Sequence, residues 1–79
     1  MSKRFITETL GWYGVVAILV AYSGISFGLL DSGDVSYQLL NLTGALSIIV
    51  DALAQKNIQP AVLNIVWGTV ALIALINLF

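Results

Sequence analysis

The stretch Thr9–Leu30, TLGWYGVVAILVAYSGISFGLL, contains no charged residue and decides the fold of this chain. Two further stretches resemble it: Val35–Val50, which continues past Asp51 to Gln55, and Asn57–Phe79. A helix needs about 20 mostly apolar residues to cross a hydrocarbon core about 30 Å thick, and each stretch is close to that length. None shows the alternation of apolar and polar residues that a transmembrane barrel strand needs.

We therefore predict an all-α fold, a three-helix transmembrane bundle with up-down-up topology that forms a single integral membrane domain over residues 1–79. The expected helices cover about residues 10–30, 36–54 and 60–79. Backbone N–H and C=O groups must pair internally in lipid, so an apolar segment of this length is helical.

The composition also indicates a membrane protein. Of the 79 residues, 59% are hydrophobic and 9% are charged, against about 25% charged residues in a typical soluble domain. A soluble chain this short needs many polar side chains to cover its surface, and here there are only three basic and four acidic residues. The expected partner for the excess apolar surface is the lipid bilayer.

Charge and residue types argue against several classes of function. The net charge is −1 and the longest basic run is Lys3-Arg4, which argues against nucleic-acid binding. The chain has no cysteine and no histidine, so it lacks thiolate chemistry and the commonest general base. No base is placed to activate a serine. We expect no enzyme activity, no cofactor and no metal site.

The connections between the expected helices are short. Asp31–Asp34 has the composition of a turn, and Asp34 or Ser36 can cap the second helix. Asn57 is expected to take the left-handed conformation that ends the second helix. Pro60, the only proline, suits the first turn of the third helix, where its missing N–H loses no hydrogen bond. Short connections make neighbouring helices antiparallel.

The basic residues predict the orientation in the membrane. Lys3 and Arg4 precede the first helix and Lys56 follows the second, whereas the other side holds only acidic residues. The positive-inside rule then predicts a multi-pass membrane protein with the N-terminus in the cytoplasm and the C-terminus outside. A signal peptide cleaved near Ala21–Ser23 is the alternative for the first segment, but such cleavage discards most of the first helix.

A stripe of small residues follows one face of the first helix, at spacings of three and four residues. Its members are Gly14, Ala17, Ala21, Gly24 and Gly28. Gly24 and Gly28 form a Gly-x-x-x-Gly pair, a pattern that lets membrane helices approach closely. The stripe packs either against the other helices of the same chain or against a second copy in a homodimer.

The other two helices each carry a face of polar and small residues. On the second helix this face holds Tyr37, Asn41, Gly44, Ser47 and Asp51, and on the third it holds Asn64, Trp67, Gly68, Ala71 and Ala74. Polar residues within a membrane normally face the bundle interior or a water-filled cavity. We therefore expect these two faces and the small-residue stripe to face one another.

The rise of 1.5 Å per residue along a helix sorts the polar side chains by depth. We predict one cluster near the outer side of the membrane, formed by Tyr22, Ser26, Gln38, Asn41 and Asn77. A second cluster near the inner side is formed by Tyr13, Asp51 and Asn64. In this arrangement Asn41 and Asn64 of one protomer lie too far apart to form a hydrogen bond.

Four residues are candidates for lining a substrate site or pore: Asn41, Asp51, Asn64 and Trp67. Asp51 is either a coupling or substrate-anchoring site within its span or an interfacial residue beside Lys56. The two asparagines either join helices by hydrogen bonds or line the pore. Trp67 lies too deep for an interfacial aromatic residue, so it either contacts a small polar ligand or packs in the bundle.

Five segments carry a resemblance to known proteins: Trp12–Gly14, Ala21–Ser23, Tyr37–Ala45, Asn57–Pro60 and Leu63–Trp67. They resemble a family of small bacterial inner-membrane proteins that has no established function and whose members are often labelled permeases. The resemblance covers nearly the whole chain and implies a compact three-helix membrane domain in the bacterial inner (plasma) membrane. It brings no substrate and no catalytic residue.

A more limited similarity is to the half-size bacterial SWEET-type sugar transporters, which are three-helix protomers that dimerise and use Trp and Asn in their pockets. Asn64 and Trp67 are the corresponding positions. That class has a Pro-Gln hinge in its first helix. Here the first expected helix has no proline, and the pair Gln59-Pro60 is reversed and lies at a loop, which argues against the same rocking motion.

Two functions are therefore expected. The first is a permease-like transporter of a small polar solute that acts as a homo-oligomer, most simply a dimer, because three helices enclose too little space for a solute path. The second is a non-transporting accessory or structural subunit whose small-residue stripe docks on a larger membrane partner. Crosslinking near Gly24 and Gly28 distinguishes self-association from a foreign partner.

Overall fold

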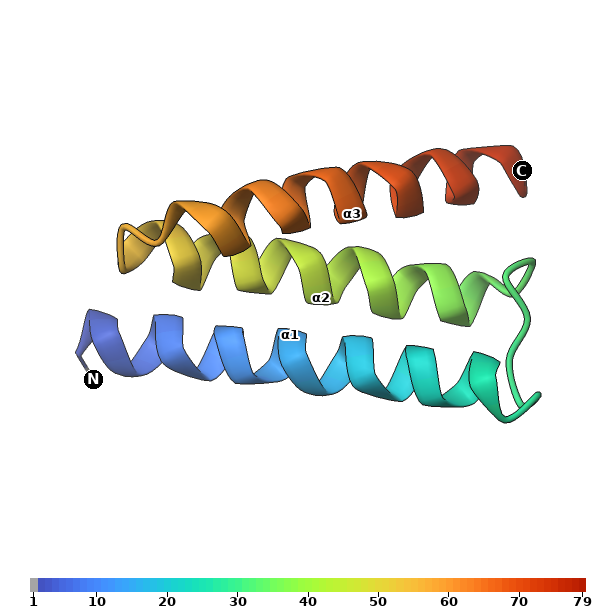
Figure 1. The fold of residues 1–79 in the computed structure, drawn as a ribbon, viewed down its shortest axis with the longest axis horizontal. Helices are drawn as coiled ribbons and strands as arrows, with labels where there is room; N and C mark the ends of the chain where they lie inside the picture. Colours follow the sequence, from blue (N-terminus) through green and yellow to red (C-terminus); the bar gives the residue numbers. More distant parts are fainter. Residues whose placement is uncertain (1) are drawn as a thin grey trace.

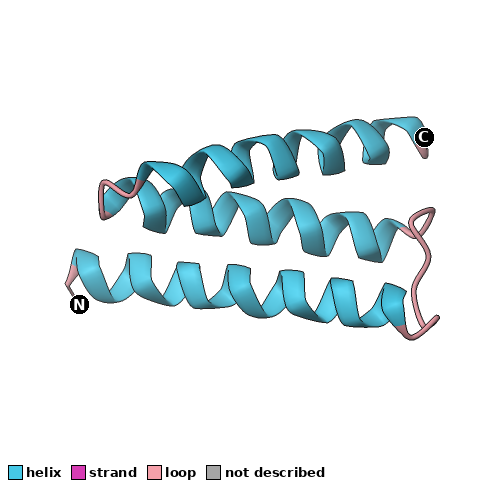
Figure 2. Ribbon diagram, in the orientation of Figure 1, coloured by secondary structure: helices cyan, strands magenta, loops and turns pink. Residues whose placement is uncertain are grey.

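The computed structural model describes residues 2–79, which form three helices and no strand. Helix α1 covers Lys3–Ser26, α2 covers Val35–Ala54 and α3 covers Ile58–Asn77. The helices lie side by side and alternate in direction (Figure 1), joined by two turns (Figure 2). Each is long and apolar enough to cross a membrane. The predicted all-α, three-helix, up-down-up fold is confirmed, and its helices have the length and composition of membrane spans.

Helix α1 is shifted toward the N-terminus relative to the predicted range of about 10–30. Ser2 caps its first turn, because the Ser2 Oγ accepts a hydrogen bond from Phe5 N at 3.1 Å. The uncharged stretch predicts the part of a helix that suits lipid, whereas the charged residues Lys3 and Arg4 extend the same helix beyond that stretch. The observed bounds of α2 and α3 lie close to the predicted ones.

A Schellman motif ends α1 before the predicted position. Gly28 has a φ of 75°, and Gly28 N donates to Ile25 O at 3.3 Å. Leu29 N donates to Gly24 O at 2.8 Å. A Cβ atom on Gly28 would meet nothing within 4 Å. Gly28 therefore takes no part in helix packing within the chain, contrary to the prediction for the stripe, because it follows the end of α1 and supplies a left-handed backbone.

The same motif ends α2, with Lys56 in the position that Gly28 holds after α1. Lys56 has a φ of 57°, and Lys56 N donates to Leu53 O at 3.1 Å. Asn57 N donates to Ala52 O at 2.8 Å. Asn57 was expected to be left-handed, but its φ is −101° and it is the N-cap residue of α3. The position of a residue relative to the helix end, and not the conformational preference of its side chain, therefore decides which residue adopts the left-handed backbone conformation here.

The turn conformation of Lys56 predicts that Lys56→Gly is more stable than Lys56→Ala. Both variants lose the charge, but only alanine keeps a Cβ atom in the left-handed region, which costs about 1 kcal/mol. Chemical unfolding of both variants in detergent micelles, followed by circular dichroism, measures the difference. Equal stabilities would contradict the left-handed conformation at this position.

Helix α2 lies between the other two helices. Both α1 and α3 pack against α2, whereas no Cα atom of α1 lies within 8 Å of a Cα atom of α3 (Figure 1). The short turns place α2 next to each of its chain neighbours. The stripe of α1 therefore packs on α2 and, at Gly24, on Leu30 of the α1–α2 turn, but not on α3, which differs from the expectation that all three faces meet.

Small residues form the contact between α1 and α2. The buried residues of α1 are Gly11, Gly14, Ala17, Ala21 and Gly24. A Cβ atom on Gly14 would lie 2.5 Å from Gly44 O and 2.5 Å from Ile48 Cγ1. The backbones of the two helices touch at this point, so only glycine fits there.

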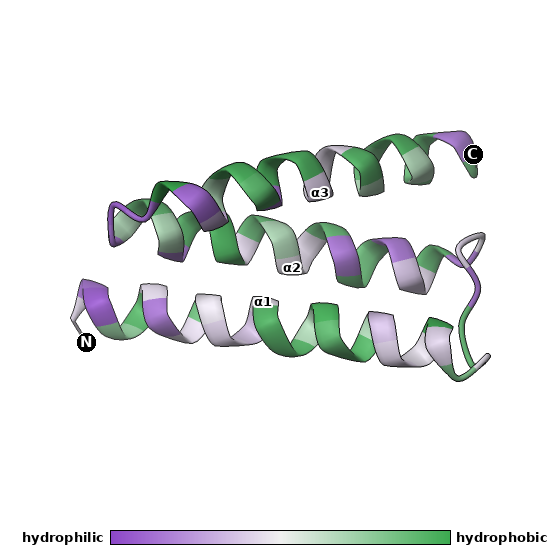
Figure 3. Cartoon of the chain, viewed as in Figure 1, coloured by the Kyte–Doolittle hydropathy of each residue, from purple (hydrophilic) through white to green (hydrophobic). Residues whose placement is uncertain are grey.

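A second row of small residues joins α2 and α3. Ala45 is fully buried, at 0% exposure, and a Cβ atom on Gly68 would lie 3.3 Å from the Ala45 Cβ atom. Among residues 2–79 no large side chain is fully buried, and most large apolar side chains point outward. Lipid suits such a surface. Hydrophilic residues occur toward both ends of the bundle, at the N-terminus and the α2–α3 turn on one side and around the α1–α2 turn and the C-terminus on the other (Figure 3).

Candidate functional site

The separation of α1 from α3 leaves a groove whose floor is α2. Three adjoining hollows follow it, each named here after one polar residue of its lining. The Asn64 hollow is lined by all three helices, the Asp51 hollow by α1 and α2, and the Asn41 hollow by α2, α3 and Ser32 of the α1–α2 turn. The Asp51 hollow has a volume of about 210 Å³, the Asn64 hollow about 340 Å³ and the Asn41 hollow about 280 Å³. Val15 and Ile48 line both the Asp51 and the Asn64 hollows, and Trp67 lines both the Asn64 and the Asn41 hollows.

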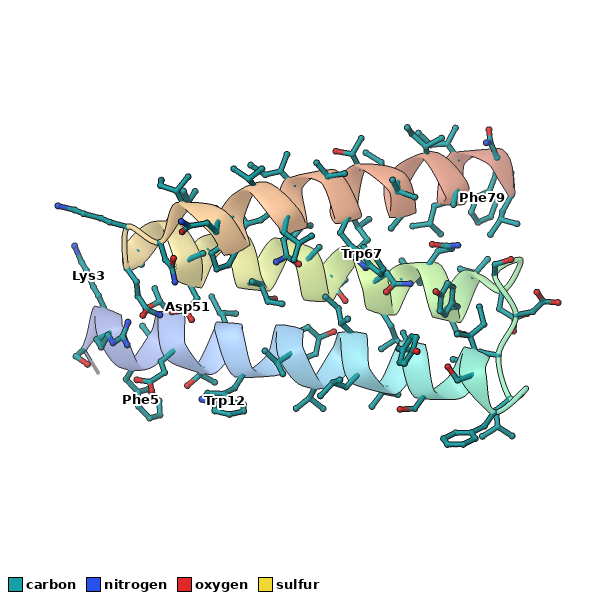
Figure 4. All side chains as sticks on the ribbon, in the orientation of Figure 1. Lys3, Phe5, Trp12, Asp51, Trp67 and Phe79 are labelled. Atoms are coloured by element: carbon teal, nitrogen blue, oxygen red, sulfur yellow. The ribbon has the colours of Figure 1, made fainter. Side chains whose placement is uncertain are left out.

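Helical spacing explains why the four predicted site residues line one groove. On α2, Asn41, Ile48 and Asp51 follow one another at intervals of seven and three residues and share a face. On α3, Asn64 and Trp67 are three residues apart and share a face. Figure 4 shows the labelled Asp51 side chain between α1 and α2 and the Trp67 side chain between α2 and α3. The sequence therefore predicted residues of one groove, although it predicted a closed bundle around them.

Asp51 lies at the end of the groove next to the first turns of α1. Its Oδ1 atom is 3.9 Å from Arg4 Nη1 and accepts a hydrogen bond from Gln55 Nε2 at 2.8 Å. The carboxylate lies against Gly11, where an added Cβ atom would overlap it. The ion-pair partner is therefore Arg4 and not Lys56, because the antiparallel packing brings the start of α1 beside the end of α2. Glu8 shares Arg4 at 3.8 Å.

Asn64 is bound to its own helix. Its Nδ2 atom donates to Pro60 O at 2.8 Å, and its side chain is buried. This hydrogen bond does not join two helices, so the expectation of an interhelical role for the Asn64 side chain has no support from its bonding. Asn64 instead contributes an amide to the wall of the Asn64 hollow.

Asn41 and Trp67 form the one side-chain hydrogen bond between α2 and α3 in the described chain. Asn41 Oδ1 accepts from Trp67 Nε1 at 3.1 Å. Asn41 is 4% exposed, whereas Trp67 is 45% exposed and faces the groove. Because Asn41 is buried, its acceptor Oδ1 atom is held in place, whereas part of the Trp67 indole ring remains exposed in the groove.

No hydrogen bond joins members of the predicted polar clusters in the described chain, although Gln38 and Asn41 line one hollow and Asn41 and Asn64 have separate partners as expected. Gln38 Nε2 donates to Ser32 O at 2.9 Å, in the turn before α2. Tyr13 and Thr43 hydroxyls are 2.9 Å apart. Long polar side chains in a narrow bundle reach the nearest backbone carbonyl or hydroxyl, so depth alone does not predict their partners.

The sequence analysis did not predict two features that hold α1 against α2, Gly11 and the Tyr13–Thr43 hydrogen bond. Gly11 extends the small stripe by one turn toward the N-terminus, a signal visible in its spacing of three residues from Gly14. The Tyr13–Thr43 hydrogen bond joins α1 to α2, and Thr43 Oγ1 also donates to Leu39 O at 2.8 Å. Because the Thr43 hydroxyl donates its hydrogen to Leu39 O, the Tyr13 hydroxyl is the donor in the hydrogen bond with Thr43 Oγ1.

Comparison with known proteins places the chain in a family. A family model matches residues 7–79, which is nearly the whole chain. The chain belongs to that family. The function of this family is unknown, and the name of the family refers to bacteria. No curated protein and no solved structure gives a significant match. The matched range contains all three helices apart from the first turn of α1, and the lining residues of the three hollows lie within it.

The Asn41–Trp67 contact predicts energetic coupling between the two residues. In a double-mutant cycle with Asn41→Leu and Trp67→Phe, we expect a coupling energy of about 0.6 kcal/mol, the typical value for an interhelical hydrogen bond in a membrane protein. The same cycle with Thr69→Val in place of Asn41→Leu is the control, since Thr69 donates to Ile65 O of its own helix. Coupling of Trp67 to both positions would contradict the assignment.

Proposed function

We propose that the protein is a permease-like transporter of a small polar solute that works as a homo-oligomer, most simply a parallel homodimer, in the bacterial inner membrane. The observation that carries this proposal is the groove between α1 and α3. It contains a carboxylate, three side-chain amides and an indole N–H along the height of the bundle, from Asp51 through Asn64 and Trp67 to Asn41 and Gln38.

A second copy is the occupant that suits the open side of the groove. In one chain the Trp67 indole is 45% exposed and the Asp51 side chain 19% exposed on the open side of the groove, and polar groups that face lipid are costly. Two copies that face each other across their grooves enclose the same groups and double the lining. The walls of the groove, such as Val15 on α1 and Leu63 on α3, are apolar and exposed, and they match the apolar character of a membrane helix contact.

The orientation is part of the proposal. Lys3, Arg4 and Lys56 lie at one end of the bundle, because the N-terminus and the α2–α3 turn are adjacent (Figure 1). The positive-inside rule places this end in the cytoplasm. The Asp51 hollow then opens near the cytoplasmic side and the Asn41 hollow near the outer side.

Crosslinking tests the dimer, and osmotic flux tests transport. The chain has no cysteine, so Val15→Cys introduces a single thiol on the groove wall and Leu46→Cys a matched thiol on the opposite side of the α2–α3 pair. We expect oxidative self-crosslinking in membranes through Val15→Cys and not through Leu46→Cys. Purified protein in liposomes should raise light-scattering shrinkage or swelling rates with at least one of glycerol, glycine, erythritol or glucose. Absence of both results would contradict the proposal.

A non-transporting accessory subunit is the second candidate, and the hydrogen bonds of the groove favour it. Asn64 donates to Pro60 O, Asn41 accepts from Trp67, and these polar groups are therefore bound within the chain. Such groups serve packing as well as solute binding. Crosslinks from Val15→Cys to a different membrane protein in place of self-crosslinks, together with no flux in liposomes, would support this function.

A further inference from the structure

Trp67 lies where two parts of the groove meet. It lines both the Asn64 hollow and the Asn41 hollow, and no other residue is common to the two. Trp67 lies near the middle of α3, which covers Ile58–Asn77. Its indole therefore borders both the half of the groove that leads to Asp51 and the half that leads to the α1–α2 turn.

Packing around Trp67 holds the ring across the groove. The next residue, Gly68, lies against Ala45, where an added Cβ atom would be 3.3 Å from the Ala45 Cβ atom. This close approach of α3 to α2 brings the indole N–H within 3.1 Å of Asn41 Oδ1. Asn41 is buried and Trp67 is nearly half exposed, so the acceptor is fixed while the ring has space on the groove side.

We propose that the Trp67 ring is a partition that divides the groove into two compartments, and that Asn41 is the positioning residue that holds the ring in place. This inference rests on the proposed function, in which a second copy covers the groove. A single interhelical hydrogen bond is a weak restraint, so rotation of one side chain opens the partition. Opening then requires no hinge within a helix, in keeping with Pro60 in the first turn of α3.

Thiol accessibility tests the partition directly. Val15→Cys reports on the Asn64 hollow, Tyr37→Cys reports on the Asn41 hollow, and Leu46→Cys reports on the opposite side of the α2–α3 pair. A membrane-impermeant maleimide is applied to full-length protein in membranes, from the side that holds the α1–α2 turn. With native Trp67 and Asn41, we expect fast labelling of Tyr37→Cys and slow labelling of Val15→Cys and Leu46→Cys.

Opening the partition should change one of these rates alone. Because a closed state with an open minor population of 0.1–10% limits access, Trp67→Ala should raise the labelling rate of Val15→Cys about tenfold or more. Asn41→Leu and Trp67→Phe should raise it by less, since each keeps a large side chain at position 67 and removes only the hydrogen bond. The rates of Tyr37→Cys and Leu46→Cys should stay within about twofold, which also reports that the variants are folded.

Two results overturn the partition. Val15→Cys labelled equally fast with and without the Trp67 ring shows that the halves are already connected, and equally slow labelling shows that another group separates them. Failure of the proposed function gives a different pattern. If the labelling differences occur without solute flux in liposomes, the proposal of a partition is supported and the proposal of transport is contradicted. If flux occurs without labelling differences, transport stands and the partition falls.

Discussion

Gly14→Ala destabilises the bundle, because the added Cβ atom lies 2.5 Å from the carbonyl oxygen of Gly44. A side-chain neighbour could rotate away, but this neighbour is backbone, so α1 and α2 must move apart. Overpacking of this kind costs about 1–3 kcal/mol. Gly14→Val adds more atoms at the same contact and should prevent stable packing of α1 on α2. Chemical unfolding in detergent micelles, followed by circular dichroism, measures both effects.

Two other glycines provide matched controls for this prediction. Gly33 lies in the α1–α2 turn, where an added Cβ atom would meet nothing within 4 Å, so Gly33→Ala should leave stability nearly unchanged. Gly11 faces the Asp51 side chain, whose carboxylate can move, so Gly11→Ala should cost less than Gly14→Ala. If Gly14→Ala were as stable as Gly33→Ala, the Gly14–Gly44 contact would not be the centre of the α1–α2 packing.

Neutralising the three basic residues should abolish the orientation proposed for the protein in the membrane. Orientation depends on the bias of Lys and Arg between the two sides, and all of these residues lie at one end of the bundle: Lys3, Arg4 and Lys56. The triple glutamine variant Lys3→Gln, Arg4→Gln, Lys56→Gln should therefore insert in both orientations. This change affects the whole population of molecules, since no basic residue remains to favour either side.

Single thiols on the two turns measure this orientation in intact cells. With the native basic residues, an impermeant thiol reagent should label Ser32→Cys in the α1–α2 turn from outside. It should label Gln59→Cys, beside the α2–α3 turn, only after permeabilisation. In the triple variant both positions should be labelled in part from outside. The control Asp31→Asn, Asp34→Asn should keep the native pattern, because acidic residues contribute little to orientation. Outside labelling of Gln59→Cys with native charges would reverse the proposed topology.

Asp51 illustrates how far a side-chain role can be predicted from its position in the chain. Its place near the end of a span predicted an interfacial carboxylate or a functional one, and the sequence offered Lys56 as the nearest cation. The structure pairs it with Arg4, which is distant in sequence and 3.9 Å away in space. The pair is partly exposed, with 56% exposure for the Arg4 side chain, and such ion pairs contribute little to stability.

Helix ends show a second limit. The uncharged stretches predicted how many spans exist and roughly where they lie, but α1 starts at Lys3 and stops before Gly28. Hydrophobicity reports on the solvent around a helix, whereas helix ends depend on local hydrogen bonds at the caps. A glycine followed by two leucines carried the signal for the end of α1, since this is the composition of a Schellman motif.

The sequence by itself determined the three membrane-compatible helices, their alternating direction and the faces that carry small and polar residues. In lipid, a helix is the way in which these apolar segments satisfy their backbone hydrogen bonds. Short turns make helices that follow one another in the chain run in opposite directions. Only the tertiary structure decided that α2 is central, that α1 and α3 stay apart and that Asn41 meets Trp67. Small residues occur on all three helices, so the partner of each face depends on which backbones fit most closely, as Gly14 fits Gly44.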